Sequence, residues 1–123
     1  MKIFLTNPFD RFARKEGIED SALREVIDRI ERGLVDVDLG GGVFKQRVSR
    51  PNAGRSGGFR SFVVYKRGET SFFIHGFAKN EKDNIQKEDL KTLKKLATEL
   101  LGYDEAGIQL LLNQGKLREL PEK

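Results

Sequence analysis

Three stretches with strand character follow one another between Val43 and Ala78, with no helical pattern between them. Short connections rich in glycine and charge separate them, which is typical of hairpins. Consecutive strands joined in this way pair antiparallel. The sequence therefore predicts a central antiparallel meander, whose strands run from Val43 to Ser49, from Phe59 to Tyr65 and from Ser71 to Ala78.

Helical patterns flank this strand region on both sides, and Lys2 to Thr6 has the character of a further short strand. Apolar residues recur there every three or four positions, as on one face of a helix. The predicted fold class is α+β, a small antiparallel meander with helices packed on one face. The apolar helical positions are Phe9, Phe12 and Ala13, then Ala22, Leu23, Val26, Ile27, Ile30 and Leu34, then Leu90, Leu93, Ala97 and Leu100, and finally Ile108, Leu111 and Leu112.

The chain has 123 residues, which fits one domain over residues 1–123, with 80–123 as its C-terminal helical part. It has no cysteine and a single histidine, so thiolate zinc sites and cysteine nucleophiles are excluded. This shortage of ligands predicts that the protein uses no metal or other cofactor. No signal peptide or apolar span is evident, and we expect a cytoplasmic protein that does not bind membranes.

Basic residues are concentrated in the strand region, although the formal net charge of the chain is only +4. A one-sign stretch in an otherwise balanced chain favours a surface that binds anions. The alternative is that these cations protect a sheet edge from aggregation. Between Gly41 and Arg67 there is no acidic residue, and the basic ones are Lys45, Arg47, Arg50, Arg55, Arg60, Lys66 and Arg67.

Four of the cations are expected to converge. Lys45 and Arg47 are two residues apart on one strand, so both side chains project from one face. Arg60 stands near the start of the next strand and Lys79 at the end of the third. Pairing as a meander would bring all four to one end of the sheet, where they could bind the backbone of a nucleic acid.

The same four residues could also cleave RNA through its own 2′-hydroxyl. That reaction needs a group to accept the 2′ proton, another to stabilise charge on the phosphate, and a third to protonate the leaving oxygen. Crowded cations make a neighbouring lysine easier to deprotonate, so Lys45 or Lys79 is a candidate base. Arginine stays charged, so Arg47 and Arg60 suit phosphate binding. Catalysis and passive backbone binding both remain open on this reasoning.

Other polar features favour structural roles. His75 lies among phenylalanines, and we interpret it as a partly buried structural histidine. Gly40-Gly41-Gly42 precedes a strand rather than a helix, which indicates a strand-entry turn and not a phosphate-binding loop.

Several segments in order carry a resemblance that extends over nearly the whole chain. They are Gly40-Gly41-Gly42-Val43-Phe44-Lys45-Gln46-Arg47-Val48, Gly54-Arg55-Ser56-Gly57-Gly58-Phe59-Arg60, Phe72-Phe73-Ile74-His75-Gly76-Phe77-Ala78-Lys79-Asn80-Glu81 and Gly115-Lys116-Leu117-Arg118-Glu119-Leu120. Together they resemble the RelE/HigB toxins of type II toxin–antitoxin systems. The resemblance implies a RelE-like fold and metal-independent cleavage of mRNA at the decoding site of the ribosome. It also implies a cognate antitoxin as partner.

By motif position, the resemblance assigns catalysis to Lys45, Arg47, Arg60 and Lys79. Asn80 stands where related enzymes often place an arginine, and Arg55 or Lys82 would have to compensate. Arg50, Arg55 and Lys82 are the expected RNA-binding residues. Two alternatives share the fold: an RNA- or ribosome-binding module without cleavage, and a ParE-like poison of DNA gyrase.

Overall fold

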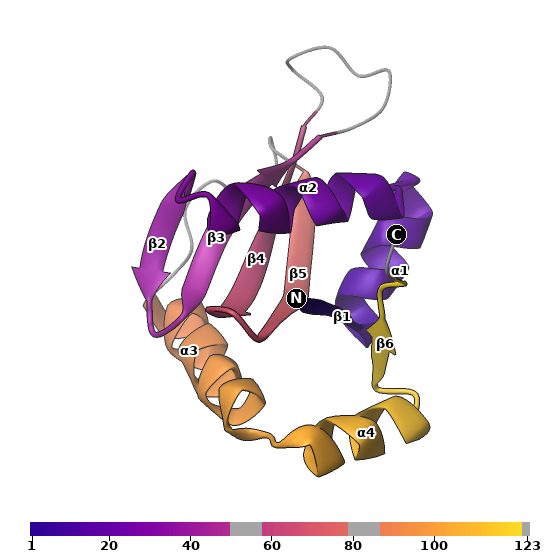
Figure 1. The fold of residues 1–123 in the computed structure, drawn as a ribbon. Helices are drawn as coiled ribbons and strands as arrows, with labels where there is room; N and C mark the ends of the chain where they lie inside the picture. The colour runs from indigo at the N-terminus through magenta and orange to yellow at the C-terminus, as the bar shows by residue number, and fades with distance from the viewer. Residues whose placement is uncertain (50–57, 79–86, 122–123) are drawn as a thin grey trace.

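The computed structural model describes residues 1–49, 58–78 and 87–121 (Figure 1). Its order of elements follows the predicted one, with one added strand before the meander and another after the last helix. The elements are β1 (Lys2–Thr6), α1 (Asn7–Glu16), α2 (Asp20–Glu31), β2 (Val37–Gly40), β3 (Val43–Val48), β4 (Phe59–Lys66), β5 (Thr70–Ala78), α3 (Lys87–Gly102), α4 (Glu105–Asn113) and β6 (Leu117–Glu119).

The strands form one sheet in the order β2-β3-β4-β5-β1-β6. Neighbours from β2 to β5 pair antiparallel, so the predicted meander and the α+β class are confirmed. The N-terminal strand β1 lies between β5 and β6, parallel to the first and antiparallel to the second. The sheet is therefore mostly antiparallel, and β3, β4 and β5 lie side by side within it.

The prediction that the helices pack on one face is wrong. Helices α1 and α2 contribute to one buried cluster, whereas α3 contributes to another on the opposite face. Consecutive strand residues explain the second layer: Phe72 and Phe73 point to opposite faces, and both are fully buried. Each face thus presents large apolar side chains that need a cover. We call the two sides of the sheet the α2 face and the α3 face.

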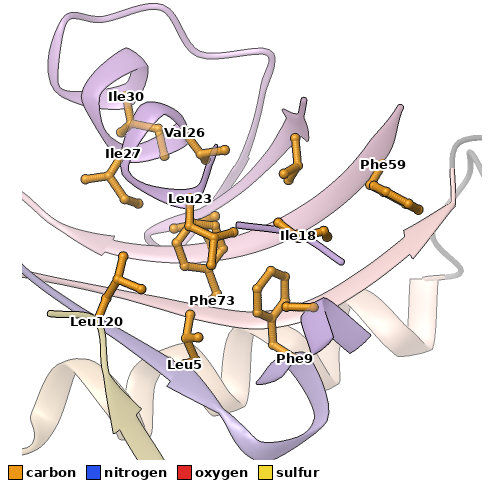
Figure 2. Close-up of a cluster of buried hydrophobic side chains, with 13 residues drawn as sticks. Leu5, Phe9, Ile18, Leu23, Val26, Ile27, Ile30, Phe59, Phe73 and Leu120 are labelled. Carbon is orange, nitrogen blue, oxygen red and sulfur yellow. The ribbon is translucent and has the colours of Figure 1, made fainter. Parts of the chain in front are cut away.

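The core on the α2 face joins the two N-terminal helices to the strands (Figure 2). Leu23 and Phe73 are buried at its centre, and Phe9 stacks obliquely on Phe73 with ring centroids 4.9 Å apart. Helix α1 ends where Gly17 adopts a left-handed conformation with φ of 68°, which lets its N–H reach back to the last turn. Leu34, predicted to belong to the helical stripe, follows the end of α2 and is 55% exposed.

The glycine turn at the start of the meander connects β2 to β3. Gly41 and Gly42 both have positive φ, 64° and 83°, as a tight hairpin between twisted strands requires. The interpretation as a strand-entry turn is confirmed. Strand β2 itself was not predicted, because four partly exposed residues leave no clear alternation.

Helices α3 and α4 follow one another along the α3 face, and Asp104 caps the second. Its carboxylate accepts a hydrogen bond from the Gly107 N–H at 2.8 Å, which satisfies one of the free donors at the start of the helix. No helix within the described ranges is long and apolar enough to cross a membrane.

Candidate functional site

The register of three strands places the predicted cations beside a group of aromatic rings. Arg47 of β3 lies opposite Arg60 of β4, which in turn lies opposite Phe77 of β5. The next row contains Lys45, Phe62 and His75 in the same order. Directly paired residues on neighbouring strands project from the same face, with Cβ atoms about 5 Å apart. Because Phe62 and Phe77 belong to the buried cluster of the α3 face, all six side chains lie on that face.

The pairing confirms that Lys45, Arg47 and Arg60 come together, as the alternation of the sequence predicted. Two guanidinium groups directly opposite one another normally destabilise a sheet. Arg47 remains 64% exposed, and among the described residues no carboxylate forms an ion pair with Arg60. This excess positive charge is the arrangement expected of a site for an anionic ligand.

Asp36, which precedes β2, holds Arg47 from the side. Its Oδ2 accepts a hydrogen bond from the Arg47 backbone N–H at 2.7 Å and lies 3.6 Å from the Arg47 Nε. The same oxygen lies 3.8 Å from the NH1 nitrogen of Arg29 on α2. Arg29 also donates a hydrogen bond to the carbonyl of Arg47. One carboxylate thus fixes the backbone at Arg47 and ties it to the helix on the other face.

Sequence reasoning missed Asp36, because its partners are 7 residues before it and 11 after it and only the β2–β3 pairing brings them together. Gln46 supplies the matching contact on the neighbouring residue. Its side-chain oxygen accepts a hydrogen bond from the Asp36 N–H at 2.5 Å, and Gln46 is fully buried. Gln46, a glutamine that alternates with the predicted cations, was the one signal that could have indicated this contact, since buried amides require hydrogen-bond partners.

His75 was interpreted as a partly buried structural residue, and that interpretation is wrong. Its side chain is exposed and stands on the α3 face, in the row that begins with Lys45. The ring of His75 is nearly parallel to Phe62, with an interplanar angle of 16° and centroids 6.2 Å apart. The alternation of the strand changes just before this residue, so its position among phenylalanines did not reveal its exposure.

The remaining predicted site residues lie outside the described part of the chain. They are the fourth catalytic candidate, Lys79, together with Arg50, Arg55, Lys82 and the substituted position Asn80. Their predicted roles stay predictions.

A separate cavity of about 690 Å³ lies at the other end of the α3 face. Lys66 and Thr70 line it from the β4–β5 hairpin, and Leu100 and Ile108 line it from the helices. None of Lys45, Arg47, Arg60 or His75 contributes to this cavity. The cation and ring group is therefore distinct from this cavity.

Comparison with known proteins adds the family. Residues 1–120 match the family model described as RelE toxin of RelE / RelB toxin-antitoxin system. A search of curated proteins found no match. The matched range takes in every helix and strand of the structure, including the strands that carry the cations. The chain belongs to the RelE toxin family, and its partner is accordingly an antitoxin.

Proposed function

We propose that this toxin is an endoribonuclease that cleaves mRNA at the decoding site of the ribosome, without a metal, by attack of the 2′-hydroxyl on the adjacent phosphate. The observation that carries the proposal is the placing of Arg47 directly opposite Arg60, with Lys45 on the same face. Membership of the RelE family supports a toxin with this kind of target. The arrangement brings three positive charges to one face of the sheet, and Arg47 is 64% exposed.

The chemistry assigns different roles to the three cations. A 2′-oxygen that attacks phosphorus loses its proton to a base, while the bond from phosphorus to the 5′ oxygen breaks and that oxygen takes up a proton. Lys45 is the proposed proton acceptor, since a lysine in its neutral amine form has a lone pair for the proton, whereas arginine stays protonated. Arg47 and Arg60 bind the phosphate and stabilise the charge that grows on it.

Lys79 is the proposed fourth catalytic residue, and Arg50, Arg55 and Lys82 are proposed to bind the RNA backbone. Contacts to phosphate carry no sequence information. Neutralising Arg50 or Arg55 should therefore weaken binding equally across mRNA sequences. The slope of log affinity against log salt should become shallower by about 0.7 to 0.9 per lost contact.

The test is to map mRNA ends after adding the purified toxin to ribosomes programmed with a defined mRNA, and to the same mRNA without ribosomes. New 5′ ends should form only with ribosomes, should persist in excess chelator, and should disappear when the nucleotide before the cut lacks its 2′-hydroxyl. A matched control is Arg11→Ala, which removes an exposed cation from α1 on the opposite face.

Three outcomes would contradict the proposal. Ribosome binding without new ends indicates a binding module, and loss of gyrase supercoiling activity with intact mRNA indicates a gyrase poison. Cleavage restored only by an added divalent metal would contradict the chemistry.

A further inference from the structure

Strand β5 contains an irregularity next to the cations. Val63 of β4 is paired with Phe73, whereas the preceding residue Phe62 is paired with His75. Ile74 is therefore an extra residue on β5 that has no counterpart on β4. Such a bulge reverses the alternation of side chains beyond it and is a recurrent means of redirecting a side chain beside a functional site.

The bulge determines which residues of β5 reach the cations. Phe72 and Ile74 lie in the cluster of the α3 face, and regular alternation would then send His75 to the α2 face. The extra residue instead keeps His75 on the α3 face, followed there by Phe77. The imidazole therefore lies next to Phe62. In a strand without the bulge it would point to the opposite face.

Contacts on both sides hold this arrangement. The hydroxyl of Thr6 lies 3.3 Å and 3.2 Å from the carbonyl oxygens of Phe73 and Ile74, and one hydroxyl proton can be donated to either. After the bulge, Gly76 faces α1, where the ring of Phe12 lies so close that an added Cβ would meet it at 2.4 Å. No larger residue fits that position, so the strand cannot shift back into register without moving α1.

The rings around His75 fix the plane of its imidazole. Phe62 is nearly parallel to it at 6.2 Å between centroids, and Phe77 is 6.3 Å away at an angle of 29°. Both phenylalanines are buried, at 5% and 9% exposure, whereas the histidine is exposed. Within the described residues, the His75 side chain forms no hydrogen bond that would explain its position as a structural anchor.

We propose that His75 is a stacking platform for one base of the bound RNA. The row Lys45, Phe62 and His75 crosses two strand spacings, about 10 Å, so a phosphate at the cations and a base on the imidazole can belong to the same short RNA segment. Proteins recognise single-stranded RNA by this combination of backbone cations and exposed flat rings. The inference rests on the proposed function, since it takes RNA to be the anion bound by Lys45, Arg47 and Arg60.

The first experiment uses the fact that the chain has a single histidine. Its imidazole proton signals can be followed by NMR without ambiguity while a short 2′-O-methyl oligoribonucleotide, which cannot be cleaved by 2′-hydroxyl attack, is added to the toxin. Stacking on a base should move these signals upfield through the ring current of the base. An oligonucleotide of the same length that lacks its bases should not cause this shift. Equal shifts with both, or none with either, would overturn the proposal.

The second experiment distinguishes the contribution of the flat ring of His75 from that of its nitrogen atoms. His75→Phe keeps a flat ring and should keep KM for ribosome-bound mRNA within a few-fold of wild type. His75→Ala should raise KM by roughly 5- to 150-fold, the range for loss of one stacked base, with a smaller change in kcat. Tyr103→Ala, which removes a ring that is 40% exposed near α4, is the matched control and should leave KM unchanged.

The outcomes distinguish this proposal from the one on which it rests. If the wild type cleaves and His75→Ala has an unchanged KM, stacking is rejected and cleavage stands. If His75→Phe fails as badly as His75→Ala, the histidine acts through its nitrogen atoms and stacking is again rejected. If the wild type does not cleave, the proposed function fails, and the base-dependent NMR shift alone decides whether His75 contacts bases.

Discussion

The two faces of the sheet use alternate residues of the same strands, yet they differ sharply where β3 meets β4. On the α2 face, Gln46, Val48 and Phe59 are buried beneath the N-terminal helices. On the α3 face, their neighbours in the sequence are Lys45, Arg47 and Arg60. Arg47 pairs with Arg60, and aromatic residues pair with Lys45 and Arg60. Alternation with a period of two thus lets one short segment serve the core on one side and a ligand on the other. Changes on the two faces should therefore have separable effects.

The largest effect is expected on the α2 face. Phe73→Ala removes a fully buried ring at the centre of the core and should lower the free energy of unfolding by about 3 to 5 kcal/mol. Unfolding by denaturant measures it, and Phe73→Leu should recover part of the loss. If Phe73→Ala stays as stable as wild type but no longer cleaves mRNA, the assignment of stability to the α2 face and of activity to the α3 face is wrong.

The opposite result is expected for Arg60. Arg60→Ala should lower the cleavage rate by a factor of about a hundred, the usual cost of losing one group that stabilises transition-state charge. Ribosome binding should persist, and stability should be unchanged or higher, since the variant removes a like-charge pair with Arg47. Arg60→Lys should recover only part of the rate because an ammonium cannot bind phosphate with two parallel hydrogen bonds. Single-turnover cleavage with a ribosome cosedimentation assay measures both, and a normal rate in Arg60→Ala would show that the site is wrongly placed.

Asp36 connects the two faces, so its loss should affect both stability and activity. Asp36→Asn removes the charge shared by Arg29 and Arg47 and should lower the free energy of unfolding by about 1.5 to 3 kcal/mol. Asp28→Asn is the matched control, because its ion pair with Arg32 is about 60% exposed on both partners and should contribute under about 1 kcal/mol. Equal losses in the two variants would show that Asp36 has no special structural role.

The smallest expected effect is a pH dependence on the α2 face. Burial, followed by the nearby Glu31 carboxylate, raises the pKa of Tyr65 above its ordinary value of 10.0. The folded state therefore holds this proton more tightly than the unfolded state, a contribution that is present in full below pH 10 and is lost as the pH rises through the folded pKa. The unfolding free energy of wild type should thus fall relative to Tyr65→Phe only in alkaline solution. A constant difference up to pH 11 would contradict this assignment.

Local patterns were sufficient to predict most elements of the fold. The strands from β3 to β5, both C-terminal helices and the cap at Asp104 follow from alternation, helical period and turn chemistry. The second helical layer was missed, although adjacent buried residues such as Phe72 and Phe73 imply that both faces must be covered. The place of β1 between β5 and β6 could not be predicted either, because pairing between distant strands leaves no local signal.

The candidate site shows the same limit at the level of single residues. Lys45, Arg47 and Arg60 were found because they follow regular alternation. The exposure of His75 was not predicted, because one inserted residue, Ile74, reverses that alternation, and the bulge contacts Thr6, which is far away in sequence. Asp36 was missed since its partners come from a helix and a strand. Sequence patterns locate regular features, whereas tertiary contacts determine the irregular ones.

The position of β1 also has a consequence for how the chain folds. The hairpins that bring Lys45, Arg47 and Arg60 together join nearby residues, whereas Lys2 pairs with Thr70 and Phe4 with Glu119. Closing such long loops costs conformational entropy before the stabilising contacts can form. Proteins rich in distant contacts therefore fold slowly. The cation-bearing hairpin should thus form early, and the pairing of β1 with β5 and β6 should form last. Until β1 pairs with β5, the apolar edge of β5 is exposed and can associate with other chains. A protein that covers this edge while the toxin folds would prevent such association.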